Sequence, residues 1–211
     1  MSDYLEQIKR ALVDGKHTEI ETLLKQALDA RLEVDNLINE GLIPAMDIVG
    51  QNFSEGKIFV PEMLVSAMTM KKALGVLKPR MERMPSKSKG KILIATVQGD
   101  LHDIGKNLVA MMLEGAGFEV IDLGVNVSLE RIIEEVTSSN PKILALSSLL
   151  TTTMPEMRSI VSMLAEKGLR DRVRVMVGGA PVDAKFADSI GADGFGKDAG
   201  EAVALARKLV G

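Results

Sequence analysis

The feature that most constrains the fold is a regular alternation of short apolar runs with amphipathic segments, from residue 91 to the end of the given sequence. The runs are rich in β-branched residues, as buried parallel strands are, and the segments between them carry apolar residues at helical spacing. Strand followed by helix, five times over, predicts a doubly wound parallel five-stranded sheet, an α/β fold. Strands are expected at 91–97, 118–123, 143–147, 172–177 and 194–196, and helices at 104–116, 129–138, 154–167, 184–190 and 199–209.

The part before residue 85 shows helical periodicity only, which predicts a four-helix bundle. Pro44 lies inside the third helical run and is expected to kink or restart it, whereas Pro61 suits the first turn of a long final helix. Small, polar and basic residues then separate the two periodicities, which is the composition of a linker. The expected organisation is a helical cap domain at 1–85, a linker at 86–90 and a Rossmann-like domain at 91–211.

Composition removes several classes of site. The chain has no cysteine, which excludes disulfides, thiolate zinc sites, iron–sulfur clusters and cysteine nucleophiles. It has only two histidines, His17 and His102, too few for a metal site built from several imidazoles. Aromatic residues make up 3% and the net charge is −3, so a nucleic-acid partner is not expected.

Targeting signals are not evident either. The N-terminal residues lack the basic start and apolar core of a signal peptide, and no apolar stretch is long enough to span a membrane. We therefore expect a cytoplasmic protein with no membrane association.

The loop after the first strand of the sheet contains the residues best suited to chemistry. A flavodoxin-like sheet binds ligands outside the carboxyl ends of its strands, and this loop holds His102 with Asp100 and Asp103 beside it. A phosphate-binding loop is excluded, because its two glycines are too far apart and Asn107 replaces the hydroxyl that would hold magnesium. A zinc site of the histidine and the two aspartates is disfavoured, because zinc usually takes more than one His or Cys.

Two interpretations of His102 remain at this point. One is a single imidazole whose second nitrogen is held by Asp100, the arrangement expected of a lone axial ligand to a cofactor metal. The other is a histidine that merely caps the following helix. The residues of this loop do not choose between them.

Motifs on three loops together resemble a known signature. They are Asp100-x-His102-x-x-Gly105 after the first strand, Ser147-x-Leu149-x-Thr151 after the third and Gly178-Gly179 after the fourth. This set resembles the cobalamin-binding signature shared by methionine synthase, base-off cobalamin mutases and the corrinoid proteins of anaerobic methyltransferase systems. In that family the histidine displaces the benzimidazole of the cofactor and becomes the lower axial ligand of cobalt.

The resemblance implies roles for individual residues. His102 would ligate cobalt, Asp100 would hydrogen-bond its other nitrogen, and Thr153 would supply the relay hydroxyl that is a serine in methionine synthase. Residues 53–62 of the bundle resemble the segment that covers the upper corrin face, which implies that Phe53 and Val60 contact the region over the methyl group. The remaining implied cofactor contacts are Gly99, Leu101, Asp103, Gly105, Ser147, Leu149, Thr151, Gly178, Gly179 and Ala199.

The order Asp, His and hydroxyl also suggests a hydrolytic triad. That interpretation fails, because the histidine directly follows a strand and the loop contains no nucleophile elbow.

The implied function is that of a corrinoid methyl carrier, a methyltransferase subunit that is not catalytic alone. The bound cobalamin or related corrinoid would accept a methyl group on Co(I) from a substrate-specific methyltransferase. Methyl-Co(III) would then pass the group to a second methyltransferase that uses tetrahydrofolate or a thiol, and a reductive activase would maintain the cofactor. Two alternatives stay open: a cobalamin-dependent sensor, and a cofactor-free receiver-like module with Asp100 or Asp103 as phosphoacceptor.

Overall fold

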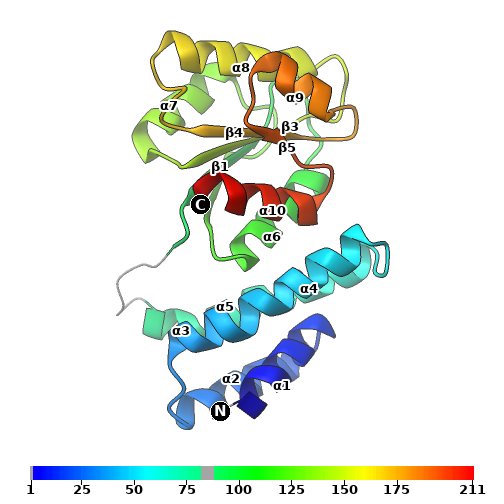
Figure 1. Cartoon of the computed structure of the whole chain (residues 1–211), viewed down its shortest axis with the longest axis vertical. Helices are drawn as coiled ribbons and strands as arrows, with labels where there is room; N and C mark the ends of the chain where they lie inside the picture. Colours follow the sequence, from blue (N-terminus) through cyan, green and yellow to red (C-terminus); the bar gives the residue numbers. More distant parts are fainter. Residues whose placement is uncertain (1, 82–87) are drawn as a thin grey trace. The chain divides into compact units, whose positions relative to one another are not determined.

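The computed structural model describes residues 2–81 and 88–211, which form two compact units (Figure 1). The first holds the described N-terminal residues, and the second holds residues 88–114 and 118–211. Residues 86 and 87 of the expected linker lie outside the described part of the chain.

The second unit is a five-stranded sheet in the order β2-β1-β3-β4-β5, with every pair parallel. This is the flavodoxin-like order, so the predicted doubly wound α/β fold is confirmed. The strands are β1 (Lys91–Thr96), β2 (Glu119–Asp122), β3 (Ile143–Ser147), β4 (Arg174–Gly178) and β5 (Gly194–Phe195). The helices are α6 (Ile104–Gly115), α7 (Leu129–Ser139), α8 (Met154–Glu166), α9 (Ala184–Ile190) and α10 (Ala199–Val210).

Helices cover both faces of this sheet. Figure 1 shows α7, α8 and α9 on one face and α6 and α10 on the other. Alternate residues of β1 supply each layer: Leu93 and Ala95 join the core under α7, α8 and α9, whereas Ile92 and Ile94 point to the opposite face and are also buried. Because helices cover both faces, the ends of the strands are the place where a ligand can approach the sheet itself.

The first unit is helical throughout, as predicted. Its elements are α1 (Ser2–Val13), α2 (His17–Asp29), α3 (Val34–Asn36), the π-helix η1 (Leu37–Leu42), α4 (Ile43–Ser54) and α5 (Val60–Met81). Since α3, η1 and α4 follow one another without a break, they form the third of the four predicted helical runs. The bundle core includes Ile8, Leu12, Ile20 and Leu24, all fully buried.

Pro44 restarts the third run rather than breaking it. It lies in the first turn of α4, directly after the π-turns, and the backbone stays helical at Asn36 and Leu42. Proline has no N–H to donate to a helical hydrogen bond, and the wider π-turns before Pro44 tolerate this loss while the backbone stays helical. In the described residues, no helix combines the length and apolarity needed to cross a bilayer.

Candidate functional site

Three loops begin side by side at the carboxyl ends of β1, β3 and β4. The strand register pairs Thr96 with Ser147 and Ser147 with Gly178, so the three strands end level with one another. The loops that follow carry most of the residues that the sequence singled out. We call residues 98–103 the histidine loop and residues 148–153 the β3–α8 loop.

Asp100 is the buried centre of the site, with an exposed fraction of 0%. Its Oδ1 accepts hydrogen bonds from the backbone N–H of His102 at 3.0 Å and from the ring Nδ1 of the same residue at 2.7 Å. Its Oδ2 accepts from the N–H groups of Leu149 at 2.6 Å and Leu150 at 3.3 Å. The Oγ1 of Thr153 also lies 3.3 Å from Oδ2. The aspartate thus joins the histidine loop to the β3–α8 loop.

This environment keeps Asp100 ionised. Burial raises the pKa of the carboxyl, but the hydrogen bonds donated by His102, Leu149 and Leu150 outweigh it and lower the pKa to about 2. A carboxylate can only accept hydrogen bonds, so the Nδ1 of His102 must carry the proton between the two groups. The tautomer of the neutral imidazole is therefore fixed, with the lone pair on Nε2.

The ring of His102 is presented to the outside. Its side chain is 52% exposed, and no described residue forms a hydrogen bond with Nε2. Exposed apolar side chains lie around it in the two loops and at the start of α6: Leu101, Ile104, Leu149 and Leu150. The site therefore presents an oriented imidazole nitrogen with exposed apolar side chains in the same loops.

Thr153 lies behind Asp100, on the side of the β3–α8 loop. Its Oγ1 lies 2.8 Å from the Oγ of Ser148 and 3.0 Å from the carbonyl oxygen of Leu150. Ser148 is fully buried and can also donate to that carbonyl at 3.0 Å. If Ser148 donates to Thr153, Thr153 can donate to the carboxylate, so the two hydroxyls form a continuous chain.

Gly179 allows β4 to approach the β3–α8 loop closely. Its φ is +127°, and a Cβ at this position would lie 1.8 Å from the carbonyl oxygen of Ser148. Gly178 is also tight, since a Cβ there would lie 3.1 Å from the Gly196 carbonyl oxygen. Only glycine fits at position 179, which gives a physical reason for the Gly-Gly pair.

The remaining predicted residues of the sheet domain differ in exposure. Gly99, Leu101, Asp103, Gly105 and Thr151 are exposed at the same carboxyl ends, and Ser147 is half-buried as the last residue of β3. Ala199 is buried in the first turn of α10. The cap residues Phe53, in α4, and Val60, which begins α5, are both half-buried within their own unit.

Sequence reasoning missed several groups that hold the site. Ser148 and the N–H of Leu150 belong to the β3–α8 loop, and Thr96 and Asn126 contact the histidine loop from its other side. Two sequence signals could have identified Thr96 and Asn126. Thr96 is the one hydroxyl in the apolar run of β1. Asn126 lies between a predicted strand and a predicted helix, and asparagine adopts the left-handed backbone of such turns more readily than most residues.

A metal cage built from the chain alone does not form in the described ranges, 2–81 and 88–211. No group of three or more His, Asp or Glu side chains lies close enough to share a metal ion. A single imidazole with a fixed tautomer instead fits a metal whose other ligands come from a macrocycle.

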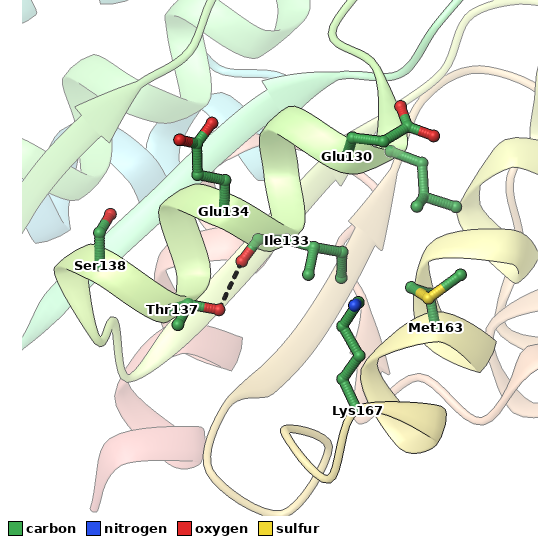
Figure 2. A pocket seen from close by; sticks show the side chains of 8 residues that line it. Glu130, Ile133, Glu134, Thr137, Ser138, Met163 and Lys167 are labelled. Atoms are coloured by element: carbon green, nitrogen blue, oxygen red, sulfur yellow. Dashed lines mark hydrogen bonds between the residues drawn. The ribbon is translucent and has the colours of Figure 1, made fainter.

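A surface groove with a volume of about 590 Å³ lies between α7 and α8 (Figure 2). Its lining residues are Leu129, Glu130, Ile133, Glu134, Thr137, Ser138, Met163 and Lys167. None of them belongs to the histidine loop or to the loops after β3 and β4, so the groove is separate from the candidate site.

Comparison with known proteins covers both units. Two family models, each described as a B12 binding domain, match residues 4–78 and 90–204. A corrinoid protein of Desulfitobacterium hafniense is 39% identical over 98% of this chain and 97% of its own length. The trimethylamine corrinoid protein of Methanosarcina barkeri is 40% identical over 96% of this chain and 94% of its own length.

A solved structure agrees with these matches. In the methanol:cobalamin methyltransferase complex MtaBC from Methanosarcina barkeri, one chain superposes with a TM-score of 0.86 and 30% identity, covering 99% of this chain and 80% of that one. The fold, the two matched domains and the relatives confirm the predicted family and its cofactor. The chain therefore belongs to the corrinoid, or B12-binding, proteins, a family represented in methylamine and methanol methyltransferase systems.

Proposed function

We propose that this chain is a cytoplasmic methyl carrier. It would take a methyl group from a donor bound to a substrate-specific methyltransferase and deliver it to a second methyltransferase that uses tetrahydrofolate or a thiol. Two similarities support the first partner: a relative named as a trimethylamine corrinoid protein, and a neighbour solved in a complex named as a methanol:cobalamin methyltransferase. A reductive activase completes the proposed set of partners.

The observation that carries the proposal is the state of His102. Its Nδ1 is fixed by the ionised Asp100, its side chain is half exposed, and none of the described residues hydrogen-bonds its Nε2. The bound corrinoid supplies a cobalt centre that can accept and release a methyl group. His102 would hold this metal through Nε2.

The other residues orient that ligand and leave room for the cofactor. Asp100 holds the ring through Nδ1–H, and the charge of a carboxylate there makes the imidazole a stronger donor to a metal. Thr153 and Ser148 hydrogen-bond behind Asp100 and fix the second carboxylate oxygen. Gly179 keeps side-chain atoms away from the close contact beside Ser148, where the cofactor tail would thread past the strand ends.

The cap contributes apolar contacts in this proposal. Phe53 and Val60 would lie over the upper corrin face, and the cap would have to move aside when a methyltransferase docks. The exposed sheet-domain residues Leu101, Leu149 and Thr151 would contact the corrin from below.

The first test is reconstitution of the full chain with hydroxocobalamin. The wild type should retain one corrinoid after gel filtration and show a base-off, His-on spectrum. Isotopic labelling of the histidine nitrogens should alter the nitrogen splitting in the electron paramagnetic resonance signal of the Co(II) state. His102→Ala should lose this splitting, because its axial nitrogen is gone.

His17→Ala is the matched control, since it removes the only other histidine of the sequence. Its spectrum should be the same as that of the wild type. Failure of the wild type to retain a corrinoid, or a His-on spectrum that survives in His102→Ala, would overturn the proposal.

Methyl transfer separates a carrier from a sensor. The loaded protein, reduced to Co(I), is mixed with candidate donors such as trimethylamine or methanol and their methyltransferases. A carrier should become methylated and should then lose the methyl group to an acceptor methyltransferase. A change of oligomeric state on ligand binding or illumination, with no methyl transfer, would instead indicate a regulatory protein.

A further inference from the structure

Hydrogen bonds hold the histidine loop from two sides, and only those on one side involve the carboxylate of Asp100. On the second side lies the β2–α7 loop, residues 123–128, between the end of β2 and the start of α7. Its contacts reach the backbone of the histidine loop rather than a side chain. They therefore control a different degree of freedom from the one that Asp100 controls.

Thr96, whose own backbone is bonded to the β2–α7 loop, makes the first of the contacts with the backbone of the histidine loop. It is the last residue of β1 and is fully buried, and its Oγ1 donates a hydrogen bond to the carbonyl oxygen of His102 at 2.9 Å. Its own N–H donates to the carbonyl of Gly124 at 3.0 Å, and its carbonyl accepts from Val127 at 3.1 Å. Because the β2–α7 loop bonds both the N–H and the carbonyl of Thr96, the hydroxyl donates to His102 from a fixed position.

Asn126 is the second contact. Its Oδ1 accepts from the N–H of Gly99 at 2.8 Å, and its own N–H donates to the carbonyl of Asp100 at 2.9 Å. One residue thus holds the backbone on either side of the Asp100 Cα. The φ of Asn126 is +51°, a left-handed conformation that asparagine adopts more readily than most residues.

An ion pair between a buried lysine and an exposed aspartate anchors this loop. The side chain of Lys106 is 1% exposed, and its Nζ pairs with Oδ2 of Asp122, the last residue of β2, and with Oδ1 of Asn107 at 2.7 Å. The other carboxylate oxygen of Asp122 accepts from the N–H of Gly124 at 2.8 Å. Since an ammonium in the first turn of a helix is disfavoured by the helix dipole, this lysine needs its carboxylate partner.

We propose that Thr96 and Asn126 are positioning residues for His102: they fix the backbone from which the imidazole projects, and so set the strength of its axial bond to the corrinoid metal. The inference rests on the proposed function. Asp100 can fix the rotation of the ring only if the backbone at residues 99–102 is itself held. Loss of either backbone contact should therefore weaken the metal–nitrogen bond without removing the Asp100 carboxylate.

The decisive variants keep local shape. Thr96→Val retains the β-branched outline and removes only the hydroxyl. Asn126→Gly retains access to the left-handed backbone and removes the Oδ1 acceptor, and Asn126→Asp restores an acceptor oxygen as the rescue variant. Thr137→Val is the matched control, because the Thr137 hydroxyl bonds only the Ile133 carbonyl within α7 among the contacts described (Figure 2).

The measurements are made on the full chain loaded with hydroxocobalamin and reduced to Co(II). We expect Thr96→Val and Asn126→Gly to retain the corrinoid but to raise the ratio of His-off to His-on species roughly two- to tenfold, the effect of one net hydrogen bond. The Co(II)/Co(I) midpoint potential should shift to less negative values, because a weaker axial ligand opposes reduction less. Asn126→Asp should return towards the wild type, and Thr137→Val should match it.

The outcomes separate the two proposals. A wild type that retains no corrinoid, or is never His-on, overturns the proposed function itself. A His-on wild type with Thr96→Val and Asn126→Gly indistinguishable from Thr137→Val overturns the positioning role and leaves the function standing. If Thr96→Val does not fold, as judged by circular dichroism, the Asn126→Gly and Asn126→Asp pair decides the question alone.

Discussion

The cap and the sheet domain differ in where they bury polar groups. Among the residues that the structure describes, seven polar or charged side chains are buried. Two are in the cap, Ser66 and Thr69, and each bonds a backbone carbonyl of the bundle. The other five lie around the carboxyl ends of the strands: Thr96, Asp100, Lys106, Ser148 and Thr153.

This contrast shows what each unit is built to do. Burying polar groups is unfavourable unless their hydrogen bonds are satisfied, and a satisfied network fixes one geometry. In the sheet domain, this network of buried polar groups surrounds Asp100 and orients the ring of His102. The cap is held mainly by apolar packing.

The largest expected effect tests the tightest contact of the sheet domain. Gly179→Ala should destabilise that domain by about 3 kcal/mol or more, because the new Cβ overlaps the carbonyl of Ser148 at a positive φ. Hydrogen exchange of the β1 and β3 amides measures the loss for this domain alone. Gly168→Ala is the control. Gly168 also has a positive φ, +66°, but a Cβ there would meet no atom within 4 Å, so backbone strain alone should cost about 1 kcal/mol. Equal losses in the two variants would contradict the importance of the close approach.

The next effect tests the carboxylate. Asp100→Asn should destabilise the sheet domain by about 2 kcal/mol, because both carboxylate oxygens face only hydrogen-bond donors and the amide must turn its NH₂ towards one set. The same exchange measurement applies. Asp103→Asn is the control in the same loop, since Asp103 is exposed and accepts from Asn107 at 3.1 Å. A change within about 0.5 kcal/mol is expected for it.

Acid should reveal the same group. The pKa of Asp100 is lowered to about 2 in the folded protein, below its ordinary value of 3.8. Its stabilising contribution is therefore complete above about pH 4 and is lost as the pH falls towards about 2, when the carboxyl takes up a proton. The difference in sheet-domain stability between wild type and Asp100→Asn should shrink over this range. A difference that stays constant with pH would show that the carboxylate is not specially stabilised.

The smallest effect tests the cap. Thr69→Val should cost less than about 1 kcal/mol, even though Thr69 is fully buried. Its hydroxyl bonds the Val65 carbonyl of its own helix and the Nδ1 of His17, and the histidine is only half-buried and can turn to water. Exchange of the α5 amides reports on this unit. A loss as large as that of Asp100→Asn would break the contrast between the two domains.

Much of the site could be predicted, because its motif residues directly follow strands. Parallel strands that end level bring Asp100, Leu149 and Gly179 to one edge, and the sequence shows where each strand ends. The supporting groups were harder to predict. Ser148 adjoins the predicted Ser147 and Leu149, and its role depends on which of two neighbouring serines turns inward. Asn126 lies in a loop whose path no periodicity describes.

The sequence by itself determined the order of helices and strands and the division between two periodicities, and it predicted His102 as the ligand of a metal. Local spacing and strand ends carry this information, because they depend on residues close together in the chain. Only the tertiary structure decided the tautomer of His102, the ionised state of Asp100 and the backbone grip by Thr96 and Asn126. The ionised state of Asp100 and the contacts of Asn126 depend on hydrogen bonds between residues far apart in sequence, such as the 2.6 Å bond from Leu149 to Asp100. The His102 tautomer and the Thr96 contact join residues close in sequence, but only the folded backbone orients these groups towards each other.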